Sequence, residues 1–281
     1  MARRLSAAGL DVRAWNRTRQ KAEALTQHGV TIAETLSSAI ADADAAIVML
    51  STGDVVEEVL FGADQTGRAP ADAFHSGATL VVMSSIPVET CRSQAARLEP
   101  KGVRYVDAPV SGGEVGARDG TLAILAGGAE ETIAELAPLF APLGRVTRIG
   151  PTGTGQMAKL ANQIIVGGTM VAVAEALHFA KTGGADIGAL RRALMGGFGD
   201  SKILNLHGER MVEENFVPGS PAQYQLKDMR TAQALAAELG LDLTLLDTLI
   251  AIFSDMIAHG EGNIDVSGVV REVARRSARA K

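Results

Sequence analysis

Residues 153–162 read Gly-Thr-Gly-Gln-Met-Ala-Lys-Leu-Ala-Asn and join a glycine turn to a long apolar segment that continues to about Lys181. Very few polar residues interrupt this segment. The pattern predicts a single long helix, and a helix that is apolar on nearly every side is expected to be buried. Lys159 and Asn162 are three residues apart near its start, so we expect them to share one helical face.

Lys159 has two interpretations. Burial and the positive end of the helix dipole both lower the pKa of a lysine, which would suit a general acid/base that works near neutral pH. Alternatively, its methylene stem lies on apolar surface while the ammonium group reaches water. On this segment alone the second interpretation is favoured, because most lysines are solvated, so other segments must decide.

Composition limits the possible functions. The chain has 281 residues, enough for about two domains, and a formal net charge of −5. Apart from residues 271–281 it has no basic block, so nucleic-acid binding is not expected. Cys91 is the only cysteine, which excludes an internal disulfide and fits a cytoplasmic location. The start of the chain does not resemble a signal peptide, and no apolar run approaches ~18 residues, so we expect no membrane span.

The pattern of elements divides the chain near residue 152. Residues 1–152 alternate short apolar strands with amphipathic helices, which is typical of an α/β domain with a mostly parallel sheet covered on both faces. We expect strands at 11–15, 45–50, 80–83, 104–110, 122–126 and 146–149, and helices at 19–28, 55–60, 88–98 and 130–139. Residues 153–281 predict an all-helical domain, with helices at about 156–181, 186–195, 201–214, 222–239, 242–259 and 264–279.

The segment Asn16-Arg17-Thr18 follows the first expected strand. In a dinucleotide-binding fold an acidic residue at such a position binds the ribose 2′-hydroxyl, whereas an arginine accommodates a 2′-phosphate. The absence of an acid and the presence of Arg17 therefore favour NADP over NAD. The alternative is that Asn16 or Thr18 caps a helix beside a surface arginine.

The segment Ser111-Gly112-Gly113 follows the expected strand at 104–110. A hydroxyl and several backbone N–H groups in such a turn can hold a carboxylate or another oxyanion. The alternative is an ordinary glycine-rich loop.

Taken together, these segments resemble the β-hydroxyacid dehydrogenase family, which includes 3-hydroxyisobutyrate dehydrogenase and tartronate semialdehyde reductase. The resemblance covers nearly the whole chain, in the right order. It rests on 1–5 with Gly9, 16–18, 83–85, 107–113, 153–162 and 225–228.

The resemblance implies an N-terminal Rossmann domain, a long interdomain helix and a helical domain like that of 6-phosphogluconate dehydrogenase, with the active site in a cleft between the domains. It implies that Lys159 is the catalytic acid/base and that Asn162, or the adjacent Gln163, orients the substrate. Ser111, Gly112, Gly113 and Lys227 would bind the substrate. The cofactor would contact Asn16, Arg17, Thr18, Leu50, Ser51, Ser85, Lys227 and Asp228. The family also implies a homodimer or homotetramer.

One departure concerns the start of the chain. In the family a strand and a Gly-x-Gly-x-x-Gly turn come before the residues that match Met1–Leu5, and this sequence has neither. The missing strand would be the central one of the order 3-2-1-4-5-6. We therefore expect the strands at 11–15 and 45–50 each to lack a neighbour, and cofactor binding to be weakened.

The expected reaction is the NADP-dependent interconversion of a small β-hydroxy acid and its semialdehyde. Two alternatives remain: an enzyme similar to the imine reductases, and a non-catalytic binding protein of the same fold. Substrate selectivity would depend on residues such as Met195, Phe198 and Tyr224. The histidines at 178, 207 and 259 have no metal-ligand spacing, so we interpret them as structural or surface residues.

Overall fold

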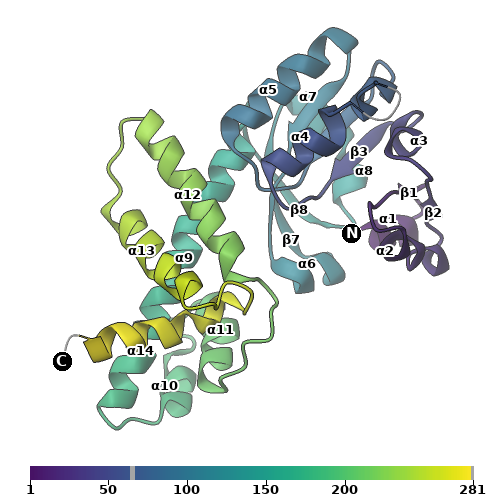
Figure 1. Cartoon of the computed structure of the whole chain (residues 1–281). Coiled ribbons are helices and arrows are strands. Elements are labelled where there is room, and N and C mark those ends of the chain that lie inside the picture. Colours follow the sequence, from purple (N-terminus) through teal and green to yellow (C-terminus); the bar gives the residue numbers. More distant parts are fainter. Residues whose placement is uncertain (64–66, 280–281) are drawn as a thin grey trace. The chain divides into compact units, whose positions relative to one another are not determined.

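The computed structural model describes residues 1–63 and 67–279, and for Arg279 only the backbone. Contacts within the chain divide it into two compact units, Met1–Lys159 (unit 1) and Leu160–Lys281 (unit 2). The longest helix, α9 (Thr154–Thr182), begins in unit 1 and continues into unit 2 (Figure 1).

Unit 1 alternates helices and strands. Before the start of α9 its elements are α1 (Ala2–Ala7), β1 (Arg13–Ala14), α2 (Arg19–Glu23), η1 (Thr26–His28), β2 (Thr31–Ile32), α3 (Leu36–Ile40), β3 (Ala45–Val48), α4 (Gly53–Phe61), η2 (Pro70–Ala73), β4 (Thr79–Val82), α5 (Val88–Leu98), η3 (Glu99–Lys101), β5 (Arg104–Asp107), β6 (Val110–Ser111), α6 (Gly113–Asp119), β7 (Leu122–Gly127), α7 (Glu130–Glu135), α8 (Ala137–Phe140) and β8 (Gly144–Gly150).

The strands form two separate sheets. One is the parallel pair β1–β2, and the other has the order β3-β4-β5-β7-β6, with β8 also paired to β7. The pairs β3–β4, β4–β5 and β7–β8 are parallel, whereas β7 runs antiparallel to β5 and β6. The expectation of a mostly parallel sheet is confirmed for these parallel pairs but misses the antiparallel ones. The single strand expected at 104–110 is divided, because β5 ends at Asp107 and β6 begins at Val110.

The expected loss of a neighbour at two strands is confirmed. Within the residues that the structure describes, β1 pairs only with β2, and β3 pairs only with β4. The Rossmann order is therefore present on either side of an interruption between β1 and β3.

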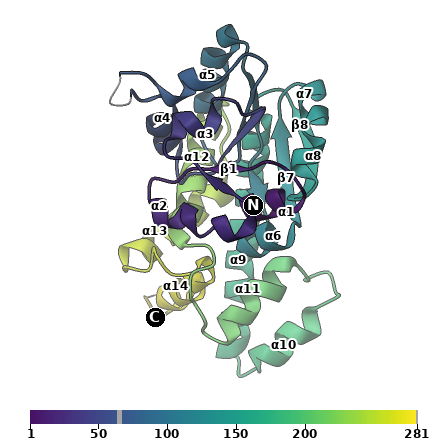
Figure 2. The same cartoon turned by 90° about the vertical axis from the view of Figure 1, so that its right-hand side faces the viewer.

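Each face of the larger sheet packs against helices. Alternate residues of β4 point to opposite faces: Leu80 and Val82 join a core with α3, α4 and α5, and Val81 joins a second core. That second core includes Leu5 of α1, Ile133 of α7 and Phe140 of α8. Figure 2 shows α3 and α4 on the side of the sheet opposite α7 and α8.

Unit 2 is helical, as expected. It contains most of α9 together with α10 (Ile187–Leu194), α11 (Lys202–Val212), α12 (Ala222–Glu238), α13 (Thr244–Ala258), η4 (Val266–Gly268) and α14 (Val269–Arg279). Figure 1 shows α12 and α13 alongside α9. Their buried side chains, among them Met170, Leu226, Met229 and Phe253, form the core of the unit.

The expectation that α9 is buried nearly all round is wrong for this single chain. Ile165 and Phe179 are 68% and 81% exposed. The helix is also long and apolar enough, by length and composition alone, to cross a membrane, although 44% of the relevant window is buried in the structure. That test gives weak support, because the core helix of a soluble protein also passes it, so the expectation of no membrane span stays a prediction.

The basic C-terminal stretch is paired with acids of its own unit. Arg271 and Arg275 contact Glu261, and Arg276 contacts Asp255 at 2.8 Å. These pairs explain the stretch without a nucleic-acid ligand. Lys281 lies outside the described residues.

Candidate functional site

The candidate site in unit 1 lies where three parallel strands end. β3, β4 and β5 run side by side, so their carboxyl ends meet at one edge of the sheet. Ligands of open α/β sheets bind outside this edge. The segments that leave these strands contain Leu50 and Ser51, then Ser85, and then Ser111. The fold therefore gathers these four predicted residues at one edge.

Buried hydrogen bonds connect these strand ends. The N–H of Leu50 donates to Oγ of Ser84 at 2.6 Å. The Gln156 side chain donates to the carbonyl of Ser84 at 2.8 Å and accepts from the N–H of Ile86 at 3.1 Å. Both residues before and after Ser85 are thus fixed through Gln156, which belongs to the first turn of α9.

Asp107, the last residue of β5, completes this network. Its Oδ1 accepts from the N–H of Gly153 and its Oδ2 from the N–H of Gln156, each at 2.8 Å. The first N–H groups of a helix have no partner within the helix, so a carboxylate is a suitable cap for them. The strand that leads to Ser111 is thereby tied directly to the helix that contains Lys159.

Two glycines allow this close approach. A Cβ at Gly127 would lie 2.6 Å from Oδ1 of Asp107, and one at Gly155 would lie 2.4 Å from the carbonyl oxygen of Leu125. Such distances are too short for any larger residue. The second glycine of the Gly-Thr-Gly stretch is therefore required by packing against the strand ends.

The electrostatic environment of Asp107 is unusual for a helix cap. Burial raises its pKa from 3.8 to about 6, and the hydrogen bonds from Gly153 and Gln156 offset only part of that increase. Burial also raises the pKa of the neighbouring Cys91 thiol well above its ordinary value. The carboxylate is thus stabilised by dipoles in a place that disfavours charge.

Ser111, Gly112 and Gly113 form an accessible turn. Ser111 ends β6 and is half-buried, whereas both glycines are exposed. Gly112 and Gly113 have φ values of 137° and 62°, which side chains rarely adopt. Gly112 precedes α6, whose start has no side-chain cap. The turn is therefore accessible and needs glycine at both positions, and its role as a carboxylate site stays a prediction.

Lys159 lies one turn after Gln156 on α9 and is half-buried. Its partial exposure is compatible with both interpretations of this lysine, so its role as acid/base stays a prediction.

The segment Asn16-Arg17-Thr18 is exposed beyond the end of β1. Oδ1 of Asn16 accepts from the N–H of Thr18 at 2.9 Å, which makes a local turn. Thr18 precedes α2, but its side chain makes no capping hydrogen bond. Arg17 is therefore positioned on the surface, where a phosphate could reach it.

Unit 2 brings together the other predicted residues. The Gln163 amide donates to Gln225 at 3.0 Å and to Asp228 at 2.9 Å, and Asn162 donates to Gln163 at 2.9 Å. Lys227 forms an ion pair with Asp228 at 2.9 Å. Asn162 and the Lys227–Asp228 pair thus belong to one polar cluster.

Sequence reasoning missed three residues of the strand-end network: Ser84, Asp107 and Gln156. All three lie in segments that were recognised, but no role was expected for them. The available signal was a polar residue at the start of a long apolar helix, and Gln156 is such a residue. By contrast, the proposed selectivity residues Met195, Phe198 and Tyr224 are exposed.

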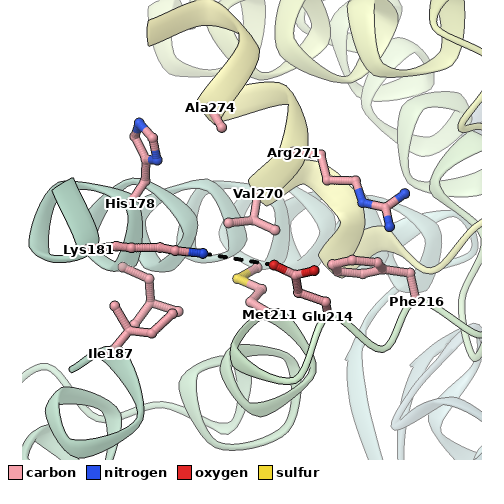
Figure 3. Close-up of a pocket in the computed structure, with 10 residues that line it drawn as sticks. His178, Lys181, Ile187, Met211, Glu214, Phe216, Val270, Arg271 and Ala274 are labelled. Atoms are coloured by element: carbon pink, nitrogen blue, oxygen red, sulfur yellow. Dashed lines mark ion pairs between the residues drawn. The ribbon is translucent and has the colours of Figure 1, made fainter. Parts of the chain in front are cut away.

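A hollow of about 290 Å³ in unit 2 is a separate feature (Figure 3). Lys181 and Glu214 pair at 3.8 Å, and the Arg271 guanidinium lies 4.5 Å from the Phe216 ring centroid. His178 lines the hollow, but no predicted catalytic, substrate or cofactor residue does. We therefore do not assign the site to it.

The other two histidines named from the sequence contact carboxylates. His207 contacts Asp265 at 3.3 Å and His259 contacts Glu272 at 2.9 Å, which supports a structural interpretation. Within residues 1–63 and 67–279, no group of His, Cys, Asp and Glu side chains is arranged to hold a metal ion.

Two family models match the sequence. Residues 1–150 match the NAD binding domain of 6-phosphogluconate dehydrogenase, and residues 153–273 match the NAD-binding domain of NADP-dependent 3-hydroxyisobutyrate dehydrogenase. Together they span nearly the whole chain.

Individual proteins of the same family are also similar to this chain. The 2-hydroxy-3-oxopropionate reductase of Escherichia coli K12 is 42% identical over 252 residues, which is 89% of this chain and 85% of the relative. A 3-hydroxyisobutyrate dehydrogenase structure from Salmonella typhimurium has a TM-score of 0.87 at 26% identity and covers 96% of this chain and 94% of its own.

A Pseudomonas imine reductase structure has a TM-score of 0.60 at 20% identity, with 96% of this chain and 93% of the other covered. At that identity the likeness concerns the fold alone. The similarities therefore favour hydroxyacid dehydrogenases over imine reductases.

Proposed function

The chain belongs to the β-hydroxyacid dehydrogenase family and is an NAD(P)-dependent oxidoreductase, and we propose that it uses NADP to interconvert a small β-hydroxy acid and its semialdehyde. One observation carries the proposal: the first turn of α9, which leads to Lys159, is bonded through Asp107 to the strand end that leads to Ser111. These bonds support the proposal because they connect the turn proposed to bind the carboxylate with the helix that contains the proposed proton donor.

The preferred substrate is a three- or four-carbon acid with a hydroxyl and an aldehyde, such as 2-hydroxy-3-oxopropionate. The 42% identical reductase bears that name, which supports this choice. In such a molecule the carboxylate and the reacting carbonyl are close together, as a small site requires.

We propose the following roles for residues of the chain in binding and catalysis. Backbone N–H groups at Gly112 and Gly113 and the hydroxyl of Ser111 bind the carboxylate. Lys159 donates a proton to the oxygen of the carbonyl as it becomes an alkoxide, and in the reverse direction removes the proton of the alcohol. The family resemblance also implies substrate-binding roles for Asn162 and Lys227, which belong to unit 2.

Several residues fit a dinucleotide. Ser51 and Ser85 are accessible at the carboxyl ends of β3 and β4, beside Leu50, and Arg17 is exposed where a 2′-phosphate would be bound. Asn16 and Thr18 flank this arginine, and Lys227 and Asp228 would contact the nicotinamide end. When bound, the cofactor supplies the hydride.

Replacing Lys159 tests the reaction. General acid catalysis contributes ~10²–10⁴-fold, so Lys159→Ala should lower kcat by about that factor while NADPH affinity, followed by fluorescence titration, stays nearly constant. Lys181→Ala, on the exposed end of the same helix, is the matched control and should keep its kcat. A Lys159→Ala enzyme that retains more than about a tenth of kcat would contradict the assignment.

Replacing Arg17 tests the cofactor. Hydrogen bonds to charged groups contribute about 1.5–3 kcal/mol, so Arg17→Asp should shift the NADP/NAD preference toward NAD at least ~10-fold. Lys21→Asp adds the same charge change on the nearby α2 and should leave the preference unchanged. Equal use of both cofactors by the unmodified enzyme would exclude NADP selectivity.

The proposal includes a homo-oligomer with unit 2 at the interface. Support comes from exposed apolar side chains in this unit, namely Ile165, Phe179, Leu239, Leu241 and Leu245. Light scattering should give at least a dimer at micromolar concentration, and Phe179→Asp should weaken it. A monomeric active enzyme would refute this part.

We also propose a cytoplasmic location and a domain boundary at residues 152/153. The single buried cysteine supports the first, and the limits of the two family models support the second.

A further inference from the structure

We infer that Asp107 is a positioning residue for the proposed reaction: its carboxylate holds the first turn of α9, and with it Lys159, against the strand end that leads to Ser111. The inference rests on the proposed function for its kinetic consequences. Its structural basis lies entirely within unit 1.

The start of α9 takes its cap from another part of the chain. Gly153 N–H and Gln156 N–H both donate to Asp107, whereas the hydroxyl of Thr154 donates to the carbonyl of Pro151 at 2.7 Å. Since Asp107 lies 46 and 49 residues away from its two donors, the cap fixes tertiary structure as well as the helix end.

Gln156 makes the second connection. Its amide bonds to Ser84 and Ile86 place the segment around Ser85 against the same helical turn. Asp107 and Gln156 are both fully buried, and a Cβ at Gly127 or Gly155 would collide with Asp107, so the backbone packs closely around this residue. The turn that precedes Lys159 therefore has one arrangement relative to β4 and β5.

The position of this turn is expected to affect kcat. A misplacement of about 1 Å at a catalytic group can cost ~10²-fold in rate. Asp107→Asn keeps one acceptor oxygen but turns an NH₂ group toward a backbone N–H, so the first turn of α9 must shift. We expect kcat to fall at least ~10-fold, with the KM for NADPH changed less than about threefold.

The pH profile provides a readout that a purely structural role would not move. Protonation of Asp107 removes negative charge from the cap, so the wild-type kcat should have an acidic limb that Asp107→Asn lacks. The titratable groups near this carboxylate are the Cys91 thiol from α5 and Tyr105 from β5; Arg92 of α5 lies beyond Cys91, and Glu57 of α4 lies beyond Tyr105. Cys91→Ala should keep the limb, which separates Asp107 from its nearest titratable neighbour.

Amide hydrogen exchange tests the same idea without activity. The N–H groups of Gly153 and Gln156 should exchange at least ~10-fold faster in Asp107→Asn than in wild type, because their acceptor is disturbed. Gln156→Met removes the hydrogen bonds to Ser84 and Ile86 while keeping the volume of the side chain, and it should also lower kcat. If Asp107→Asn does not fold, Gln156→Met takes its place in the test.

Asp265→Asn is the matched control. Asp265 is a buried aspartate of unit 2 that also accepts from backbone N–H groups. Its replacement should lower the Tm but keep kcat per folded enzyme within about twofold.

Two outcomes overturn the inference. One is an unchanged kcat per folded molecule in Asp107→Asn and Gln156→Met; the other is unchanged exchange at residues 153–156. A wild-type enzyme inactive on aldehyde acids would refute the proposed function instead, and the exchange result would then decide the positioning role by itself.

Discussion

Asp107 in unit 1 and Asp265 in unit 2 are both buried aspartates that accept hydrogen bonds from backbone N–H groups, yet their pKa values move in opposite directions. Burial raises the pKa of Asp107 to about 6, against the partial offset from Gly153 and Gln156. Burial alone would also raise the pKa of Asp265, but hydrogen bonds from His207, Ser267 and Gly219 outweigh it and hold the pKa well below its usual range.

The difference lies in the neighbours. Asp265 has His207 at 3.3 Å and Arg210 at 3.5 Å, together with the Ser267 hydroxyl at 2.6 Å. The side chains that face Asp107 include a thiol, and its two closest donors are backbone amides. The hydrogen bonds and the nearby Arg210 guanidinium favour the charged form of Asp265, whereas at Asp107 burial outweighs the backbone dipoles and favours the neutral form. Unit 2 uses its aspartate to join segments, and unit 1 uses its aspartate to place a helix beside the site.

The largest expected effect comes from removing Asp265. Asp265→Ala leaves Arg210 without its buried counter-charge and the N–H groups of Gly219, Ser220 and Ser267 without their acceptor. Breaking a buried pair by removing one partner costs about 3–5 kcal/mol, so the free energy of unfolding in urea should fall by that amount.

Alkylation of Cys91 is a control that shows which of the two units unfolds. It is the only cysteine and is buried in unit 1, so its rate of alkylation reports opening of that unit. Asp265→Ala should lose unit 2 helicity before Cys91 reacts. A loss of stability under about 1 kcal/mol would show that the cations are satisfied elsewhere.

The second prediction concerns pH. The folded pKa of Asp107 is about 6 and the ordinary value is 3.8, so the folded state holds this proton more tightly. Its contribution to stability is therefore fully present below about pH 4 and is lost as pH rises through about 6, a change on the order of 3 kcal/mol. Asp265 has the opposite sign: its contribution is present above its ordinary pKa and is lost as pH falls.

The measurement is the free energy of unfolding of wild type and of each Asp→Asn variant from pH 4 to pH 8. The advantage of wild type over Asp107→Asn should be larger at pH 4 than at pH 7. The advantage over Asp265→Asn should stay nearly constant over this range, because the ordinary pKa of 3.8 lies below it. A flat difference for Asp107→Asn would contradict the raised pKa.

The contrast between these aspartates also shows how far the sequence could lead. Apolar periodicity and glycine turns predicted the α/β order and the long helix, because these depend on local patterns. The two strands that each lack a neighbour followed from the family resemblance, and the site segments followed from motifs together with that resemblance. What spacing cannot reveal is a bond such as Gln156 to Ser84, 72 residues apart, or a cap donated by Asp107.

Short strands were missed for a related reason. β2 (Thr31–Ile32) has two residues, and two residues have no periodicity to detect. β7 pairs antiparallel with β5 through Asp107 and Gly127, and with β6 beyond the break between Asp107 and Val110. Apolar periodicity does not detect such a break, because the residues on both sides of it continue one apolar stretch.

The smallest expected effect compares the glycines beside the two aspartates. A Cβ at Gly155 would lie 2.4 Å from the Leu125 carbonyl, 2.6 Å from the Asp107 carbonyl and 2.8 Å from Oδ2 of Asp107. Since two of these atoms are backbone, Gly155→Ala should cost about 1–3 kcal/mol despite the better helix propensity of alanine. A Cβ at Gly219 would lie 3.4 Å from Oδ2 of Asp265, an ordinary contact.

Gly219→Ala should therefore change stability by less than about 0.5 kcal/mol, and urea unfolding of both variants makes the comparison. Gly155→Ala should also speed amide exchange at residues 153–156, because the cap on α9 must move, whereas Gly219→Ala should not. If the two variants were equally stable, the surroundings of Asp107 would be able to relax as readily as those of Asp265. The first turn of α9 could then not be held in one position by packing, and the carboxylate alone would have to fix it.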